Sequence, residues 1–327
     1  MGVSRPSRPR WAVTLASNRA VSLKRVAQSA ALRSGLSVQL MRARNGRAII
    51  MLHGVGDADM PLADFVTAMR WLKRHFRILS LDAMLRNMQE GRPPDIMGEV
   101  ALTFDDGLRN HAESAYPVLK ALGLPATFFV CPGLIESGQW LWSHEARSRL
   151  RRLSEPKRID LIAALQAPAS ETETIMAWMK ALPLQQRQFA EDHIREATPD
   201  FVPTRQERIA YDPLDWGVLR HLDPRLITVG SHTINHPILP TLNDELMHDE
   251  MTRSRAWLES ELGRPVDLFC YPNGSQDQRA HRLAAQTYRA AVSTREGHPF
   301  PGVDWHAIPR IPVAARLPLL AWRMCRS

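Results

Sequence analysis

Short apolar runs recur along the chain and predict buried β-strands. A run of four to eight apolar residues between polar or turn residues is typical of a strand that is covered on both faces. The first three runs occupy residues 48–52, 78–79 and 100–102. The later runs occupy residues 126–130, 226–229, 266–271, 290–293 and 308–313.

Amphipathic helices are expected between these strands. Phe65, Met69, Leu72 and Phe76 recur at helical spacing within residues 59–76. Further helices are expected over residues 113–122, 243–262 and 279–287. Strands that alternate with helices pair in parallel, so the pattern predicts an α/β protein.

Residues 138–222 interrupt this alternation. They are polar and rich in Arg, Glu and Gln, with helical spacing at residues 146–153 and 159–165. We interpret the segment as a helical insertion between two core strands that covers the functional site. Trp140, Trp142 and Trp216 are candidates for stacking on sugar rings or for ordinary packing.

The charge of the 327-residue chain is unevenly distributed. Its formal net charge is +8, yet residues 1–47 contain ten Lys and Arg and no acidic residue. The remaining residues carry 32 basic and 34 acidic side chains, which argues against nucleic acid as a partner. We therefore divide the chain into a basic N-terminal extension, residues 1–47, partly helical from Asn18, and a catalytic unit, residues 48–327.

Cysteine usage and hydropathy indicate the compartment. The three cysteines are widely spaced and form no C-x-x-C pair, which suggests a reducing environment. No run reaches the roughly 18 apolar residues of a membrane span, and no signal-peptide pattern is seen. We expect a cytoplasmic protein whose basic N-terminus is a candidate for peripheral contact with anionic lipid. The sequence predicts no oligomeric state.

Two adjacent carboxylates, Asp105 and Asp106, follow the strand predicted at residues 100–102. Neighbouring side chains of a strand point to opposite faces, so the chain must leave extended geometry here if both carboxylates are to face one cavity. Gly107 permits such a turn. Because like charges raise each other's pKa, two carboxylates this close favour a nearby cation.

Two histidines supply candidate ligands for that cation. His232 and His236 follow the strand predicted at residues 226–229 and converge if the segment forms a helical turn. Two imidazoles and one carboxylate leave coordination positions open, which is typical of a catalytic zinc site. These residues alone do not distinguish which aspartate binds the metal. His53, at the end of the first strand, is expected to face the same cavity.

Three motifs carry a resemblance to a known family. They are T-F-D-D-G at residues 103–107, His-Thr-x-x-His-Pro at 232–237 and F-C-Y-P-N-G at 269–274. Together they resemble the polysaccharide deacetylases of carbohydrate esterase family four, the NodB-homology domain, over roughly residues 48–313. With the strand pattern, the prediction is a distorted (β/α) barrel of about seven parallel strands with a helical insertion.

The resemblance implies roles for individual residues. Asp106, His232 and His236 are expected to bind a divalent metal, zinc, and Asp105 to act as the general base. The backbone N–H of Asn273 is expected to donate to the oxyanion. A bound metal lowers the pKa of a coordinated water and polarises the acetyl carbonyl.

Two departures from the family pattern affect the site. Cys270 stands where many members carry an arginine that orients the base, and Arg310 is the candidate that replaces it. The late Leu-x-His motif, source of the general acid, has no match after Leu317. His306 and His298 are therefore the candidate acids.

The predicted function is a metal-dependent hydrolase that removes acetyl groups from N-acetylated sugars of a polysaccharide or glycan precursor. Two alternatives stay open. One is hydrolysis of a cyclic amide on the same barrel, because the same activated water would serve. The other is a sugar-binding relative with little turnover, suggested by the two departures from the family pattern.

Overall fold

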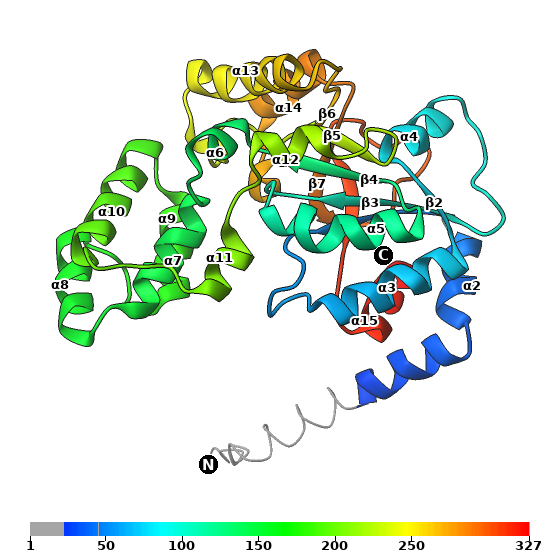
Figure 1. Cartoon of the computed structure of the whole chain (residues 1–327), viewed down its shortest axis with the longest axis horizontal. Helices are drawn as coiled ribbons and strands as arrows, with labels where there is room; N and C mark the ends of the chain where they lie inside the picture. The colour runs from blue at the N-terminus through cyan, green and yellow to red at the C-terminus, as the bar shows by residue number, and fades with distance from the viewer. Residues whose placement is uncertain (1–22, 45, 327) are drawn as a thin grey trace, which may run out of the picture.

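The computed structural model describes residues 23–44 and 46–326. The helix start predicted at Asn18 lies outside these residues. Figure 1 shows a barrel of strands surrounded by helices, with a group of helices, α7–α11, to one side.

Seven parallel strands form a closed ring. Because β1 pairs with both β3 and β8, the sheet has no open edge between them, and the predicted distorted (β/α) barrel is confirmed. Ring order is β1-β8-β7-β6-β5-β4-β3. The strands are β1 (Arg47–Leu52), β3 (Glu99–Phe104), β4 (Ala126–Val130), β5 (Ile227–Ser231), β6 (Leu268–Cys270), β7 (Ala290–Glu296) and β8 (Ile308–Pro312).

An eighth strand, β2 (Arg77–Leu79), lies beside the ring on β3. It pairs with the first half of β3, at Glu99 to Ala101, whereas β4 pairs with the second half, at Thr103 and Phe104. β1 pairs along the whole of β3. Two short strands therefore share one edge of β3, and this distorts the barrel next to the aspartate pair.

Helices cover the outside of the barrel and bury its apolar strands. The long helix α13 is capped at its start by Asn243, whose side chain accepts a hydrogen bond from the backbone N–H of Leu246, and at its end by Gly263. Its bounds confirm the expected helix. Two covering helices, α4 and α15, were not expected from the sequence. The helices are α3 (Leu62–His75), α4 (Leu81–Gln89), α5 (Tyr116–Leu122), α13 (Asp244–Leu262), α14 (Gln278–Thr287) and α15 (Leu317–Arg326).

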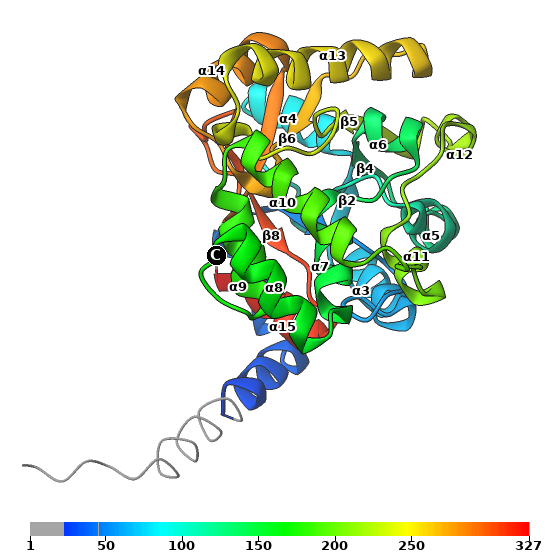
Figure 2. The ribbon, with the colours of Figure 1, turned by 90° about the vertical axis from the view of Figure 1, so that its left-hand side faces the viewer.

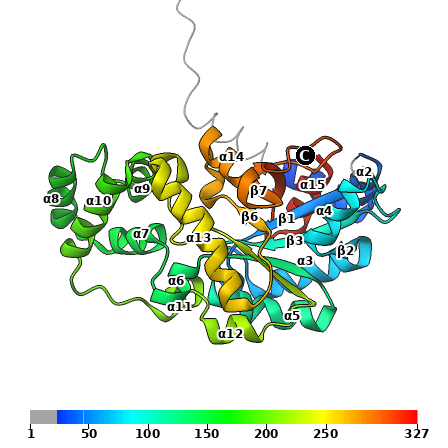
Figure 3. The same ribbon diagram turned by 90° about the horizontal axis from the view of Figure 1, so that it is seen from above.

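Seven helices lie between β4 and β5, although these two strands pair directly with each other. They are α6 (Pro132–Ser137), α7 (Trp142–Arg152), α8 (Glu155–Leu165), α9 (Thr172–Ala181), α10 (Leu184–Ala197), α11 (Arg205–Tyr211) and α12 (Trp216–His221). Helices α7–α10 share a hydrophobic core of their own, which includes Leu150, Met179 and Ile194. Leu219 of α12 packs instead into the barrel core. Figure 3 shows α7–α10 as a lobe beside the barrel, and in Figure 2 the same helices lie in front of it.

Residues 23–33 are helical and precede α2 (Leu36–Arg44), which packs against α15. Leu23 and Val26 in this first helix are 71% and 63% exposed. Among the described residues, no helix has the length and the apolar composition needed to cross a membrane.

Candidate active site

The aspartate pair lies where β3 ends. Asp105 still donates its backbone N–H to the carbonyl of Leu52, but Asp106 and Gly107 have φ angles of 76° and 67°. The chain thus leaves extended geometry at the predicted point. A Cβ atom at Gly107 would lie 3.0 Å from the Cβ atom of Val130, so the turn and the close approach of β4 both favour glycine.

Arg310, on β8, holds Asp105 in a buried, two-pronged ion pair. Its Nη1 and Nη2 donate to the two carboxylate oxygens at 2.7 and 2.6 Å, and both side chains are almost fully buried. The same guanidinium donates to Thr103 Oγ1 and to the carbonyl of Ser293. Burial raises the pKa of Asp105, but the charge and hydrogen bonds of Arg310 outweigh burial, so the pKa lies below its usual value.

Asp106, His232 and His236 form a compact buried group. The Nε2 atoms of His232 and His236 lie 3.5 and 3.4 Å from Oδ1 of Asp106. One ligand atom from each residue lies within 4.8 Å of the other two. Burial raises the pKa of Asp106, but hydrogen bonds from both imidazoles leave it well below the usual value. The structure therefore brings together all three residues predicted to bind metal.

The donor atoms of this group suit a zinc ion. His232 Nδ1 donates to the carbonyl of Cys270 at 2.6 Å, so Nε2 is the ring nitrogen that faces Asp106, and once its proton leaves it offers a lone pair to a metal. His236 Nδ1 is buried and has no partner among the described residues. Two imidazole nitrogens and one carboxylate oxygen match the ligands of an open, catalytic zinc site.

The two histidines converge without the helical turn that the sequence analysis considered. Residues 232–236 form a loop in which Thr233 and His236 have φ angles of 67° and 54°. Oε2 of Glu250, on α13, accepts hydrogen bonds from the backbone N–H groups of Ile234 and Asn235 and so holds the loop. Left-handed residues, rather than a helix, bring the rings to 4.8 Å between centroids.

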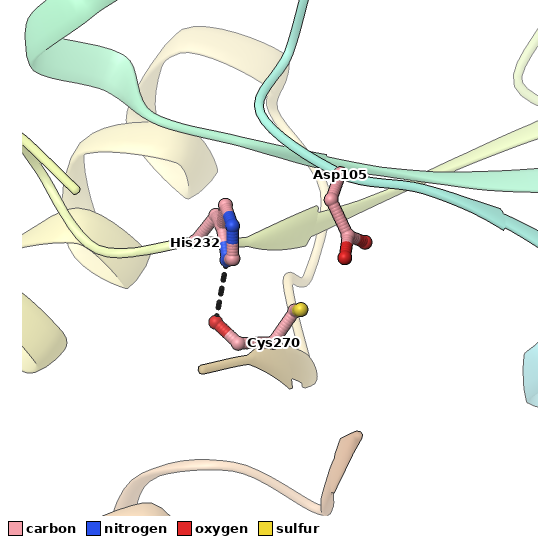
Figure 4. A group of neighbouring side chains, drawn as sticks. All are labelled: Asp105, His232 and Cys270. Carbon is pink, nitrogen blue, oxygen red and sulfur yellow. Dashed lines mark hydrogen bonds between the residues drawn. The ribbon is translucent and has the colours of Figure 1, made fainter. Parts of the chain in front are cut away.

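Asp105, His232 and Cys270 form a second group with metal-ligand spacing. In Figure 4, the three side chains come from separate elements and the His232 ring bonds the Cys270 carbonyl. Both oxygens of Asp105 are already engaged by Arg310, which also donates to Cys270 Sγ at 3.2 Å. Burial raises the pKa of the Cys270 thiol. A protonated thiol is a poor metal ligand, and the carboxylate oxygens of Asp105 already accept hydrogen bonds from Arg310. The group of Asp106, His232 and His236 therefore suits a metal better.

The remaining predicted residues differ in their placement. Asn273 lies in the turn Pro272–Gly274 after β6, at the end of the barrel where His232 follows β5. His306 precedes β8 at the other end, where its Nε2 contacts the carbonyl of Tyr288. His298 contacts the carbonyl of Arg47, where β1 begins. Neither candidate acid is brought to the Asp106 group.

Two imidazoles near the site were not assigned by sequence reasoning. His144, on α7, stacks on Tyr211 with centroids 4.4 Å apart, and burial lowers its pKa to about 4. The charges of Asp106 and His236 also influence the pKa of His144. An imidazole of the helical lobe is therefore part of the electrostatic environment of the site. His111 bonds the carbonyl of His53. His144 lies in no motif, and only its place in the polar insertion could have suggested it.

A closed (β/α) barrel with buried carboxylates and imidazoles at the carboxyl ends of its strands is the arrangement of a barrel enzyme. The comparisons define the family. The chain matches the family model for polysaccharide deacetylases over residues 94–291, and it belongs to that family. This match contains all three motifs.

YxkH of Bacillus subtilis (strain 168), which carries the name of a polysaccharide deacetylase, is 32% identical over 87 residues. That alignment spans 25% of this chain and 30% of YxkH.

Solved structures share the fold. The deacetylase PplD of Streptococcus pyogenes, in complex with acetate, aligns over 86% of this chain and 98% of its own, with a TM-score of 0.59 and 18% identity. IcaB from Ammonifex degensii aligns over 86% of this chain and 97% of its own, with a TM-score of 0.57 and 18% identity. At this identity, the likeness describes the barrel alone.

Proposed function

We propose that this protein is a metal-dependent hydrolase that removes acetyl groups from N-acetylated sugars of a polysaccharide or glycan precursor. The observation that carries the proposal is the buried group of Asp106, His232 and His236 next to an Asp105 that is anchored by Arg310. Membership of the polysaccharide deacetylase family supports it. So does the acetate in the PplD complex, because acetate is the product expected here.

Each residue has a role that its surroundings support. Asp106, His232 and His236 would hold zinc, which when bound acidifies water and polarises a carbonyl. Asp105, kept ionised by Arg310, accepts the proton of the attacking water. The backbone N–H of Asn273 donates to the oxyanion that forms from the acetyl carbonyl. Arg310 is a positioning residue because it acts through Asp105.

Acetate release from a panel of N-acetylglucosamine oligomers and N-acetylated sugar nucleotides tests the proposal. We expect release that a chelator abolishes and added zinc restores. Asp105→Asn should retain bound metal and lose activity, whereas Asp249→Asn, a matched change on the outer helix α13, should retain both. Full activity of Asp105→Asn would refute the assigned base. Opening of a cyclic amide without acetate release would favour the first alternative, and sugar binding without turnover the second.

We further propose that the helix over residues 23–33 contacts anionic lipid on the cytoplasmic side of a membrane. The exposed Leu23 and Val26 lie beside Lys24 and Arg25, and apolar residues beside basic ones suit such a surface. The protein should sediment with vesicles containing phosphatidylglycerol and stay in solution with pure phosphatidylcholine. Leu23→Ser/Val26→Ser should weaken sedimentation, and equal binding to both kinds of vesicle would contradict the charge argument.

A further inference from the structure

The candidate site lies where β3 and β5 end, and the opposite end of the barrel is formed by segments that contact one another. Arg42 Nε donates to the carbonyl of Met97 at 2.8 Å, and Arg44 Nη1 donates to the carbonyl of Cys325 at 3.2 Å. His298 contacts the backbone where β1 begins. Figure 1 shows α2 and the loop after α4 on the side of the barrel that faces away from helices α7–α11. We call four segments the amino-end face: α2, residues 90–98, residues 297–302 and the last turn of α15.

Large apolar side chains are exposed on the amino-end face. Ile96 is 92% exposed, Phe300 50% and Leu36 47%. Outside the helical insertion and the first helix, six large apolar side chains of the described residues are exposed. Four of the six, including Met97, lie on this face. Single exposed apolar residues need no explanation, but several that share one face indicate an interaction site.

The same face is basic. Its four segments carry five arginines and two acidic residues. Both acidic residues are already paired, Glu90 with Arg92 at 2.5 Å and Asp95 with Arg77 at 3.3 Å. The net charge of the face is therefore positive, which attracts an anionic surface. The five arginines are Arg42, Arg44, Arg92, Arg323 and Arg326.

An anionic bilayer suits this face better than a folded protein. The exposed apolar side chains come from three separate segments, and arginines share two of these segments: Arg42 follows Leu36 on α2, and Arg92 precedes Ile96. Apolar side chains that insert separately, with arginines beside the phosphates, are typical of a peripheral contact with anionic lipid. A stable protein interface would instead need a continuous patch of roughly 800 Å² on each partner. The face also continues across Gly35 into the first helix, for which lipid contact is proposed above.

We infer that the amino-end face is a second membrane contact, through which the barrel itself lies on an anionic bilayer with Ile96 and Phe300 among the lipid headgroups. The inference extends the lipid contact proposed for the first helix, and it does not depend on hydrolysis. Its consequence is an orientation. Because the two ends of the barrel are opposite, the candidate site opens away from the lipid and takes its substrate from the aqueous side.

Ile96→Ser/Phe300→Ser tests the contact. Both side chains are exposed, so their replacement leaves the core intact. Leu62→Ser/Leu246→Ser is the matched control, because these side chains are 44% and 42% exposed and lie on α3 and α13, outside the face. The assay is sedimentation with vesicles of phosphatidylglycerol and phosphatidylcholine. The first double variant should bind about tenfold more weakly than the wild type, and the control should bind within about twofold of it.

A fluorescent label tests the orientation. The three native cysteines are buried, so one introduced cysteine can carry an environment-sensitive nitrobenzoxadiazole label. On Met97→Cys the emission should rise and shift to the blue when the phosphatidylglycerol vesicles are added. On Leu246→Cys, which replaces a side chain of similar exposure, it should stay as in water. Equal responses from the two labels would overturn the orientation.

The outcomes separate the two lipid contacts. If Ile96→Ser/Phe300→Ser bound like the wild type while Leu23→Ser/Val26→Ser bound weakly, the first helix would be the whole contact and the inference would be overturned. Equal binding of the wild type to vesicles of pure phosphatidylcholine would overturn the role of the arginines. A wild type that bound no vesicles would overturn both contacts in favour of a protein partner. The proposed hydrolase would stand in each case.

Discussion

Replacing Arg310 with methionine should strongly destabilise the protein. Methionine keeps much of the length of the side chain but removes the charge and every hydrogen bond of the guanidinium. Asp105 would then be a buried carboxylate without its counter-ion. Removing one partner of a buried ion pair costs about 3–5 kcal/mol. A domain is typically stable by only about 5–15 kcal/mol, so this loss is a large share of the total.

Urea denaturation of four proteins measures the effect: wild type, Arg310→Met, Asp105→Asn and the double variant. We expect each single variant to lose free energy of unfolding, because each leaves a polar or charged partner buried without its complement. The double variant removes both charges, so its loss should be smaller than the sum by about 1–3 kcal/mol. Additive losses, or a loss below about 1 kcal/mol for Arg310→Met, would refute the reasoning.

The same variant has a second, catalytic readout. Without Arg310, the burial that raises the pKa of Asp105 is opposed only by the smaller influence of His53 and His232, so this pKa should rise. The acid limb of the profile of kcat/KM against pH should then move to higher pH in Arg310→Met. A purely structural role would lower activity without moving that limb, and an unmoved limb would contradict Arg310 as the residue that keeps Asp105 ionised.

Three further predictions concern pH, backbone and metal. Burial lowers the pKa of His111 to about 4, against about 6.5 in the unfolded chain. Between pH 7 and pH 5 this residue alone should cost the folded protein about 2 kcal/mol of stability, so urea denaturation of His111→Phe should show a flatter dependence on pH than the wild type. Gly274 and Gly123 both have positive φ, but only a Cβ at Gly274 would meet Thr294, 1.9 Å from its Oγ1. Gly274→Ala should therefore lower the melting temperature more than Gly123→Ala, and equal shifts would contradict the contact. Added zinc should raise the melting temperature of the wild type but not of His236→Ala, and metal analysis should find the variant depleted.

The barrel was largely predictable because its strands are buried on both faces. The apolar runs at 48–52 and 126–130 coincide with β1 and β4 to within one residue. The unexpected helix α4 has a signal that was available: Ser80 caps it, and Leu81, Met84, Leu85 and Met88 follow at helical spacing. The segment follows directly on the short strand β2 and was assigned to no element.

The parts of the site that sequence motifs specify were predictable. The parts that depend on tertiary packing were less so. The convergence of Asp106 with two histidines followed from strand ends that share one rim of the barrel. The left-handed residues that bring the rings together have no reliable sequence signal, because Thr233 is not a residue that favours positive φ. The approach of α7, with His144, depends on how the helical lobe packs on the barrel. No local pattern specifies that packing.

The lobe leaves the barrel after β4 and returns at β5, and these two strands are hydrogen-bonded neighbours. Its entry and exit points are thus fixed by the sheet itself, whatever the intervening chain contains. A different lobe could therefore be exchanged at the same junction while β3, β5 and β8 keep their side chains in place. Chimaeras joined at this junction offer a route to measure what the lobe contributes to the choice of substrate.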